Sequence, residues 1–186
     1  PGARGPKGVT GASGEDGSAG VAIVRNIPAG NVITTLDSTS KSSSITIGAD
    51  GFVLISYYDS TNRDLKVAHC ENTACTSATT STLDSPDSGF SPYGMETSIT
   101  IGVDGLALIS YRDIDNYELK VGHCQNIVCT SFTSIPGAAP LDQSGDEVGE
   151  ESSITIGADG LALISYRYWN LDNGDLKVAH CSNTAC

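Results

Sequence analysis

Apolar residues in this chain fall into short runs that recur three times. Each unit opens on alternating positions, as in Ile45 to Ile47, and then reaches a Gly-x-Asp-Gly turn. An almost unbroken apolar run follows, such as Leu106 to Tyr111, then a polar turn and a second run such as Leu119 to Cys124. A Thr- and Ser-rich stretch such as Thr76 to Leu83 ends the unit. Runs of this length between turn residues predict four short antiparallel strands per unit.

The three units are near copies of one another. They span residues 44–97, 98–152 and 153–186, and each contains Asp-Gly-x-x-Leu-Ile-Ser-Tyr and Leu-Lys-Val-x-His-Cys. Repeated units of this kind are expected to stack on their neighbours. The third unit lacks the Thr- and Ser-rich stretch, whereas residues 31–38, within the connector 21–43, resemble it. We therefore expect residues 31–38 to supply the missing strand.

The second strand of each unit distinguishes among all-β folds. Leu106 and Leu108 point to one side, and Ala107, Ile109 and Tyr111 point to the other. A strand that is apolar on both faces belongs to a sheet covered on both sides. This predicts a β-propeller-like head, with a β-prism or a β-trefoil as alternatives. Because propellers usually have about 4 to 8 sheets, we expect the repeats of three chains to pack together, with the closing strand given to a neighbour.

The first 20 residues have glycine at every third position. Only glycine fits at the axis of a collagen triple helix, so the strict period predicts a collagen-like stalk; a flexible Gly-rich linker is the alternative. Three chains would then form a homotrimer, and we expect the stalk to continue upstream. The glycines of this segment are Gly2, Gly5, Gly8, Gly11, Gly14, Gly17 and Gly20.

The chain is acidic, with 22 Asp and Glu against 10 Lys and Arg and a net charge of −12. An acidic surface repels phosphate backbones, so nucleic acid is not an expected partner. The apolar fraction of 39% is sufficient for a folded core. No stretch approaches the roughly 20 apolar residues of a membrane span, so none is expected.

All cysteines fall in three Cys-x4-Cys pairs, each preceded by a histidine. We predict disulfides that close short loops; zinc sites and free thiols are the alternatives, although the spacing is not that of a zinc knuckle. Regular pairing indicates an oxidising compartment and hence an extracellular or cell-surface location. The cysteines are Cys70, Cys75, Cys124, Cys129, Cys181 and Cys186.

Carboxylates and amides recur in the turn after the second strand of each unit. Several oxygen ligands within a few residues could bind Ca²⁺, but Asp and Asn are also common in tight turns, so both interpretations stay open. The candidates are Asp59, Asn62, Asp64, Asp113, Asp115, Asn116, Glu118, Asp172, Asn173 and Asp175.

Tyrosines and histidines recur at fixed positions in the repeat. Tyr57, Tyr111 and Tyr166 are expected to pack between neighbouring units, whereas Tyr168 and Trp169 break the pattern and are candidate ligand-binding residues. The repeated histidines, His69, His123 and His180, are either neutral side chains packed between units or ligand contacts.

No catalytic motif is present, and the repeated carboxylates favour binding over catalysis. A hydrolase related to sialidases would need an arginine cluster, and Arg63, Arg112 and Arg167 stand one per repeat at unequal positions. We therefore expect no enzyme activity.

The repeat motif resembles a tandem repeat of secreted and surface proteins of bacteria, and residues 1–20 resemble the stalk of bacterial collagen-like surface proteins. The resemblance implies a trimeric stalk that carries a globular head. Up to nine equivalent weak sites would give multivalent binding to a surface or a glycan. A structural subunit of an extracellular filament or appendage and a phage tail-fibre-like receptor-binding protein are the alternatives.

Overall fold

The computed structural model describes residues 30–85, 96–113, 116–134, 141–142, 147–169 and 173–186. The stalk predicted for residues 1–20 lies outside them. The described residues contain strands and turns but no helix. Sheet 1 consists of β1 (Ser40–Ile47), β2 (Val53–Asp59), β3 (Asp64–Cys70) and β4 (Ala78–Asp84); sheet 2 of β5 (Thr97–Ile101), β6 (Ala107–Asp113), β7 (Glu118–Cys124) and β8 (Phe132–Ser134); sheet 3 of β9 (Glu147–Ile156), β10 (Ala162–Trp169) and β11 (Gly174–His180).

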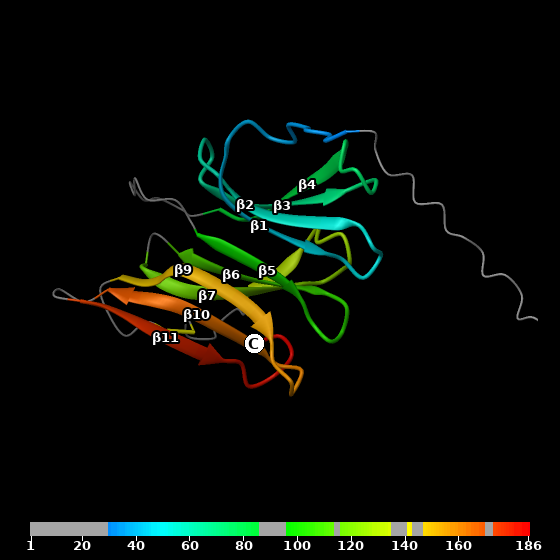
Figure 1. Cartoon of the computed structure of the whole chain (residues 1–186). Coiled ribbons are helices and arrows are strands. Elements are labelled where there is room, and N and C mark those ends of the chain that lie inside the picture. Colours follow the sequence, from blue (N-terminus) through cyan, green and yellow to red (C-terminus); the bar gives the residue numbers. More distant parts are fainter. Residues whose placement is uncertain (1–29, 86–95, 114–115, 135–140, 143–146, 170–172) are drawn as a thin grey trace, which may run out of the picture. The chain divides into compact units, whose positions relative to one another are not determined.

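Every sheet is an antiparallel meander in which consecutive strands pair. The three sheets lie face to face in chain order, with sheet 2 in the middle (Figure 1). Their first strands, β1, β5 and β9, contact one another in sequence. The prediction of short antiparallel strands in three repeated units is confirmed. Meanders stacked with their first strands side by side also resemble the blades of a propeller.

Two apolar cores hold the stack together. The first lies between sheets 1 and 2 and includes Leu65, Ile99 and Tyr111. The second lies between sheets 2 and 3 and includes Leu119 and Ile164. As predicted, the strand β6 is buried along its whole length because it has a sheet on either side.

The outer faces of the stack are exposed. Ile45 and Ile47 on β1 are 67% and 59% exposed, and Leu176 and Val178 on β11 are 81% and 63% exposed. Sheet 3 has three strands among the described residues. Residues 33–38 form no ladder with β11; they lie beside sheet 1 instead, where Asp37 accepts a hydrogen bond from Tyr57. Within one chain, residues 33–38 therefore do not pair with the third sheet. That they supply its missing strand stays a prediction for the third sheet of a neighbouring chain.

Tight turns connect the first two strands of each sheet. Gly48 donates its N–H to the Phe52 carbonyl at 2.7 Å, and Gly51 has φ +83°, a conformation that favours glycine. The Asp50 side chain accepts from the Phe52 N–H at 3.0 Å. Gly102 and Gly157 begin the same turn in the other two units, which explains the recurring Gly-x-Asp-Gly sequence. No helix in the described ranges is long and apolar enough to cross a membrane.

Candidate functional site

The three cysteine pairs form disulfides, as predicted. Each joins the end of a third strand, or the residue just after it, to a cysteine across a short loop: Cys70 to Cys75, Cys124 to Cys129 and Cys181 to Cys186. Stable disulfides of this kind belong to proteins outside the reducing cytosol, so the chain functions in an oxidising, extracellular environment.

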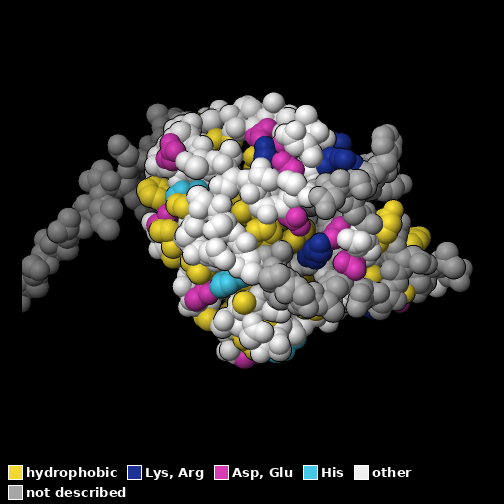
Figure 2. Space-filling model, turned by 180° about the vertical axis from the view of Figure 1, so that it is seen from behind, with side chains coloured by type: hydrophobic (Ala, Val, Ile, Leu, Met, Phe, Trp, Pro, Cys, Tyr) yellow, Lys and Arg dark blue, Asp and Glu magenta, His cyan; other side chains and the backbone are white. Residues whose placement is uncertain are grey.

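The recurring histidine pairs with the aspartate of the turn in its own sheet. Nε2 of His69, His123 and His180 lies 2.8 Å from a carboxylate oxygen of Asp50, Asp104 and Asp159, respectively. Figure 2 shows histidines beside acidic side chains on one face of the molecule. These ion pairs tie the first turn to the end of the third strand. The histidine side chains of sheets 1 and 2 are 10% and 18% exposed, and that of His180 on the outer sheet is 50% exposed.

The carboxylates proposed as calcium ligands take part in the turns. Burial alone would raise the pKa of Asp59, but the Lys66 ammonium at 2.7 Å and the Asn62 and Thr61 donors lower it well below its usual range. In the second unit, Asp113 likewise accepts from the backbone and side chain of Asn116 and pairs with Lys120. A lysine therefore occupies the place beside each carboxylate that a cation would need.

The other calcium candidates are spread along the strand starts. Asp64, Glu118 and Asp175 lie at the beginning of β3, β7 and β11, and Asp64 accepts a hydrogen bond from Ser85. Asn173 directly precedes β11, while Asp115 and Asp172 lie outside the described residues. Within the ranges that the structure describes, no group of three or more His, Cys, Asp or Glu side chains could hold a metal ion.

A tyrosine and an aspartate link each unit to the segment before it. The buried hydroxyl groups of Tyr57, Tyr111 and Tyr166 donate to Asp37, Asp84 and Asp142 at 2.9, 2.8 and 2.7 Å. Burial and the neighbouring carboxylate raise the pKa of each phenol. The predicted packing between units is confirmed for Tyr111 and Tyr166, which belong to the two cores. Tyr57 lies beside residues 34–37 instead.

A second polar contact between units joins sheets 2 and 3. Glu150 on β9 accepts from Arg112 on β6 at 2.9 Å, and its other oxygen lies 3.5 Å from Nη1 of Arg167 on β10. Arg112 is buried, so Glu150 compensates a charge removed from water. Burial, followed by the Glu150 charge, raises the pKa of the nearby Glu96.

Aromatic rings lie over both arginines. Cζ of Arg167 is 4.2 Å from the centre of the Trp169 ring, and Cζ of Arg112 is 5.4 Å from that of Tyr117. Trp169 remains 39% exposed. Tyr168 is partly buried in the second core, and Nζ of Lys177 lies 4.0 Å from its ring centre. Of the two rings predicted to contact a ligand, Trp169 is therefore the accessible one.

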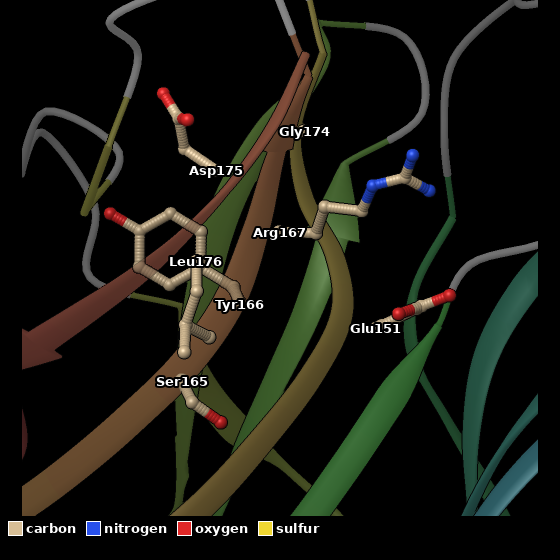
Figure 3. A pocket seen from close by; sticks show the side chains of 7 residues that line it. All are labelled: Glu151, Ser165, Tyr166, Arg167, Gly174, Asp175 and Leu176. Atoms are coloured by element: carbon tan, nitrogen blue, oxygen red, sulfur yellow. The ribbon is translucent and has the colours of Figure 1, made fainter.

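A shallow hollow adjoins Arg167 on the outer face of sheet 3. Figure 3 shows Arg167 and Glu151 on one side of it, and Asp175 and Leu176 on the other. Gly174 allows this arrangement, because a Cβ there would lie 2.6 Å from Nε of Arg167. We refer to Arg167, Trp169, Glu150 and Glu151 as the junction site. It combines an exposed ring, a guanidinium and carboxylates, the groups that bind sugar rings and hydroxyls.

Of the junction site, the sequence pattern predicted Trp169 but not Arg167, Glu150 or Glu151, and the prediction of unequally placed arginines is wrong for two of them. Arg112 and Arg167 both follow the Ser-Tyr of the second strand and meet at Glu150. Tyr58 occupies the equivalent position in the first unit. Among the described residues, the first unit therefore does not repeat the junction site. The matching Ser-Tyr-Arg sequences in units two and three were the signal that could have found it.

Comparisons with known proteins identify the fold alone. No family model and no curated protein matches the chain. An α-L-arabinofuranosidase from Lactobacillus brevis is similar in structure, with a TM-score of 0.55, 11% identity and coverage of 79% of this chain and 50% of the other. For an endo-arabinase from Bacteroides thetaiotaomicron, the values are 0.50, 13%, 77% and 56%. This chain therefore spans about half the length of either structure. A fucose lectin from Kordia zhangzhouensis aligns at TM-score 0.46, with 11% identity over 77% of this chain and 99% of the lectin.

Proposed function

We propose that this chain is an extracellular glycan-binding protein, in which a collagen-like stalk joins three chains and each propeller-like head binds a sugar at the junction site. The observation that carries the binding role is the half-exposed Trp169 ring beside Arg167, Glu150 and Glu151. A sugar ring would stack on the indole, while the guanidinium and the carboxylates would bind its hydroxyls.

Multivalency would supply the affinity. The site occurs once among the described junctions, so a trimer would present one site per chain. Linking weak sites in this way raises the apparent affinity by roughly 10² to 10⁴ when a surface offers several copies of the ligand. Such a protein would mediate display or adhesion at a cell surface. The triple helix itself is tested by replacing Gly11 with Ala, which should lower the melting temperature of the collagen circular dichroism signal and weaken trimer formation.

A glycan array tests the binding role. Arabinose-containing polysaccharides are the first probes, because an arabinofuranosidase and an endo-arabinase share the fold. We expect Trp169→Ala to abolish binding. Ile127→Ala is the matched control: Ile127 is also an exposed apolar residue, at 45%, but lies in the disulfide loop after β7. Equal binding by both variants would contradict the proposal.

Glycoside hydrolysis is the second candidate, favoured by a specific pair of carboxylates. Glu96 has a raised pKa and lies close enough to Glu150 to be affected by its charge, and glycosidases use one protonated and one ionised carboxylate. Incubation with arabinan separates the two functions. Release of reducing ends that is lost in Glu96→Gln would establish hydrolysis, whereas binding without release supports the binding role.

A further inference from the structure

The two outer faces of the stack carry the same residues that the inner faces bury. Leu176 and Val178 on sheet 3 occupy the repeat positions of Leu65 and Val67 on sheet 1, which are 0% and 1% exposed. On the opposite end, Ile45 holds the position of Ile99, a buried member of the first core. The outer face of sheet 3 therefore matches the face of sheet 1 that packs on sheet 2. The outer face of sheet 1 matches the face of sheet 2 that packs on sheet 1.

We infer that a second copy of this chain supplies the missing half: its sheet 1 packs on the outer face of sheet 3, and its residues 33–37 become the fourth strand of that sheet. The contact is head to tail, because sheet 3 of one copy meets sheet 1 of the next. It repeats the arrangement already present twice within the chain.

Residues 33–37 are already held where such a strand would be. In the chain, β4 pairs with β3 and its last residue, Asp84, accepts the hydrogen bond of Tyr111 on the next sheet. Asp37 accepts the equivalent bond from Tyr57 without any strand before it. Residues 33–37 therefore lie next to sheet 1 in the same way that β4 lies next to sheet 2. Unlike β4, they are not paired with the three other strands of a sheet.

A hollow on the outer face of sheet 1 marks the space for these strands. It lies between the segment and the sheet, and is lined by Thr34, Leu36, Ile55, Tyr57 and Ala68, among others. In the filled junction between sheets 1 and 2, the equivalent space contains Leu65 and Val67. Leu176 and Val178 of the second copy are the matching side chains.

Hydrogen bonds along the first strands fit the same contact. The Ile99 N–H donates to Oγ of Ser44 at 3.2 Å, and the Ile154 N–H donates to Oγ of Ser98 at 3.2 Å. Ser153 and Ile45 hold the corresponding positions at the two ends of the stack. Between copies, the Ile45 N–H would donate to Ser153.

One corner differs from the inner junctions. Lys41 holds the repeat position of Glu150, so it would face Arg167 of the other copy without forming an ion pair. The apolar contacts and the added strand must therefore provide the stability. The junction site lies on this same face of sheet 3, with Leu176 in its hollow, so a sugar and a second copy would compete for that face.

A head-to-tail contact either closes into a ring or continues as a filament. Two copies closing on each other bring the number of sheets into the range of roughly 4 to 8 seen in propellers. The contact needs no collagen stalk and no sugar, so its test is separate from the tests of the proposed function.

Cysteine cross-linking of the full chain tests the contact. By the register of β3 with β4, where Val67 is opposite Ser81, Thr34 of one copy lies opposite Val178 of the other. Thr34→Cys and Val178→Cys chains carrying different tags are co-expressed and mildly oxidised. We expect a disulfide-linked pair containing both tags, with the cross-linked peptide that joins positions 34 and 178 identified by mass spectrometry.

The matched control pairs Thr34→Cys with Ala179→Cys, because neighbouring residues of a strand point to opposite faces. It should give little linked pair. Equal linkage in both combinations, or none in either, would overturn the inference, whatever the glycan array and the collagen signal show. A linked pair that grows into a ladder of larger species indicates a filament formed through the same contact.

Discussion

The ring of Phe132 occupies the space that a side chain on Gly122 would need. A Cβ added to Gly122 would overlap the ring directly. In the first repeat, alanines hold both positions, as Ala68 and Ala78. Where the first repeat has two alanines, the second repeat thus has a glycine and a phenylalanine.

Gly122→Ala should destabilise the head by about 1 to 3 kcal/mol, because overpacking forces the ring or the strands to shift. Chemical denaturation measures the change. Phe132→Ala and the double variant complete a cycle. The loss in the double variant should be smaller than the sum of the two single losses, since the alanine pair of sheet 1 is restored. Strict additivity would mean that the two positions do not compete for space.

Tyr111→Phe removes the hydroxyl that joins sheet 2 to Asp84 of sheet 1. The ring is fully buried and its hydrogen bond to the carboxylate is 2.8 Å long. A bond to a charged group contributes about 1.5 to 3 kcal/mol, so the free energy of unfolding should fall by a comparable amount. Tyr117→Phe is the control, because Tyr117 is 40% exposed. Similar losses in the two variants would argue against the role of the junction bond.

Acid should weaken the head through its turn carboxylates. The hydroxyl and backbone N–H of Thr39 lower the pKa of Asp37, and the Lys66 and turn contacts described above lower that of Asp59. A depressed folded-state pKa contributes stability that is complete above the ordinary value of 3.8 and is lost as the pH falls through the depressed value.

Thermal unfolding at a series of pH values between about 7 and 2 measures this loss. Asp59→Asn should be less stable than the parent chain at pH 7, and the difference should narrow as the pH falls below 3.8. A difference that stays constant across this range would show that Asp59 contributes through its shape and not through its charge.

Gly174→Ala should move Arg167 away from its place beside Trp169, because the new Cβ would contact the guanidinium group. We expect sugar binding to weaken by at least tenfold with little change in the melting temperature, since the displaced side chain is partly exposed. Gly30→Ala is the control, at a position where a Cβ meets no atom within 4 Å. Titration calorimetry with the best array ligand makes the comparison, and unchanged affinity in Gly174→Ala would remove Arg167 from the site.

The regular part of the molecule could be predicted from the sequence because it repeats. Alternation, turn glycines and the Cys-x4-Cys spacing are local signals, and strands such as Leu119 to Cys124 follow from them. The pairing of His69 with Asp50 could not be predicted, because it depends on the distance between the first turn and the end of the third strand in the folded sheet. The meeting of Arg112 and Arg167 at Glu150 depends on packing between units, which periodicity within one unit does not describe.

The bond from Asp84 to Tyr111 has a further consequence for the history of the gene. Each joint between neighbouring sheets is made from two consecutive repeats, as in the hydrogen bonds from Ile99 to Ser44 and from Ile154 to Ser98, so duplication or deletion of whole units would keep the same kind of joint between the remaining sheets. Repeat number can thus drift in evolution at little cost. A designed chain with an extra copy of residues 98–152 should fold without compensating mutations.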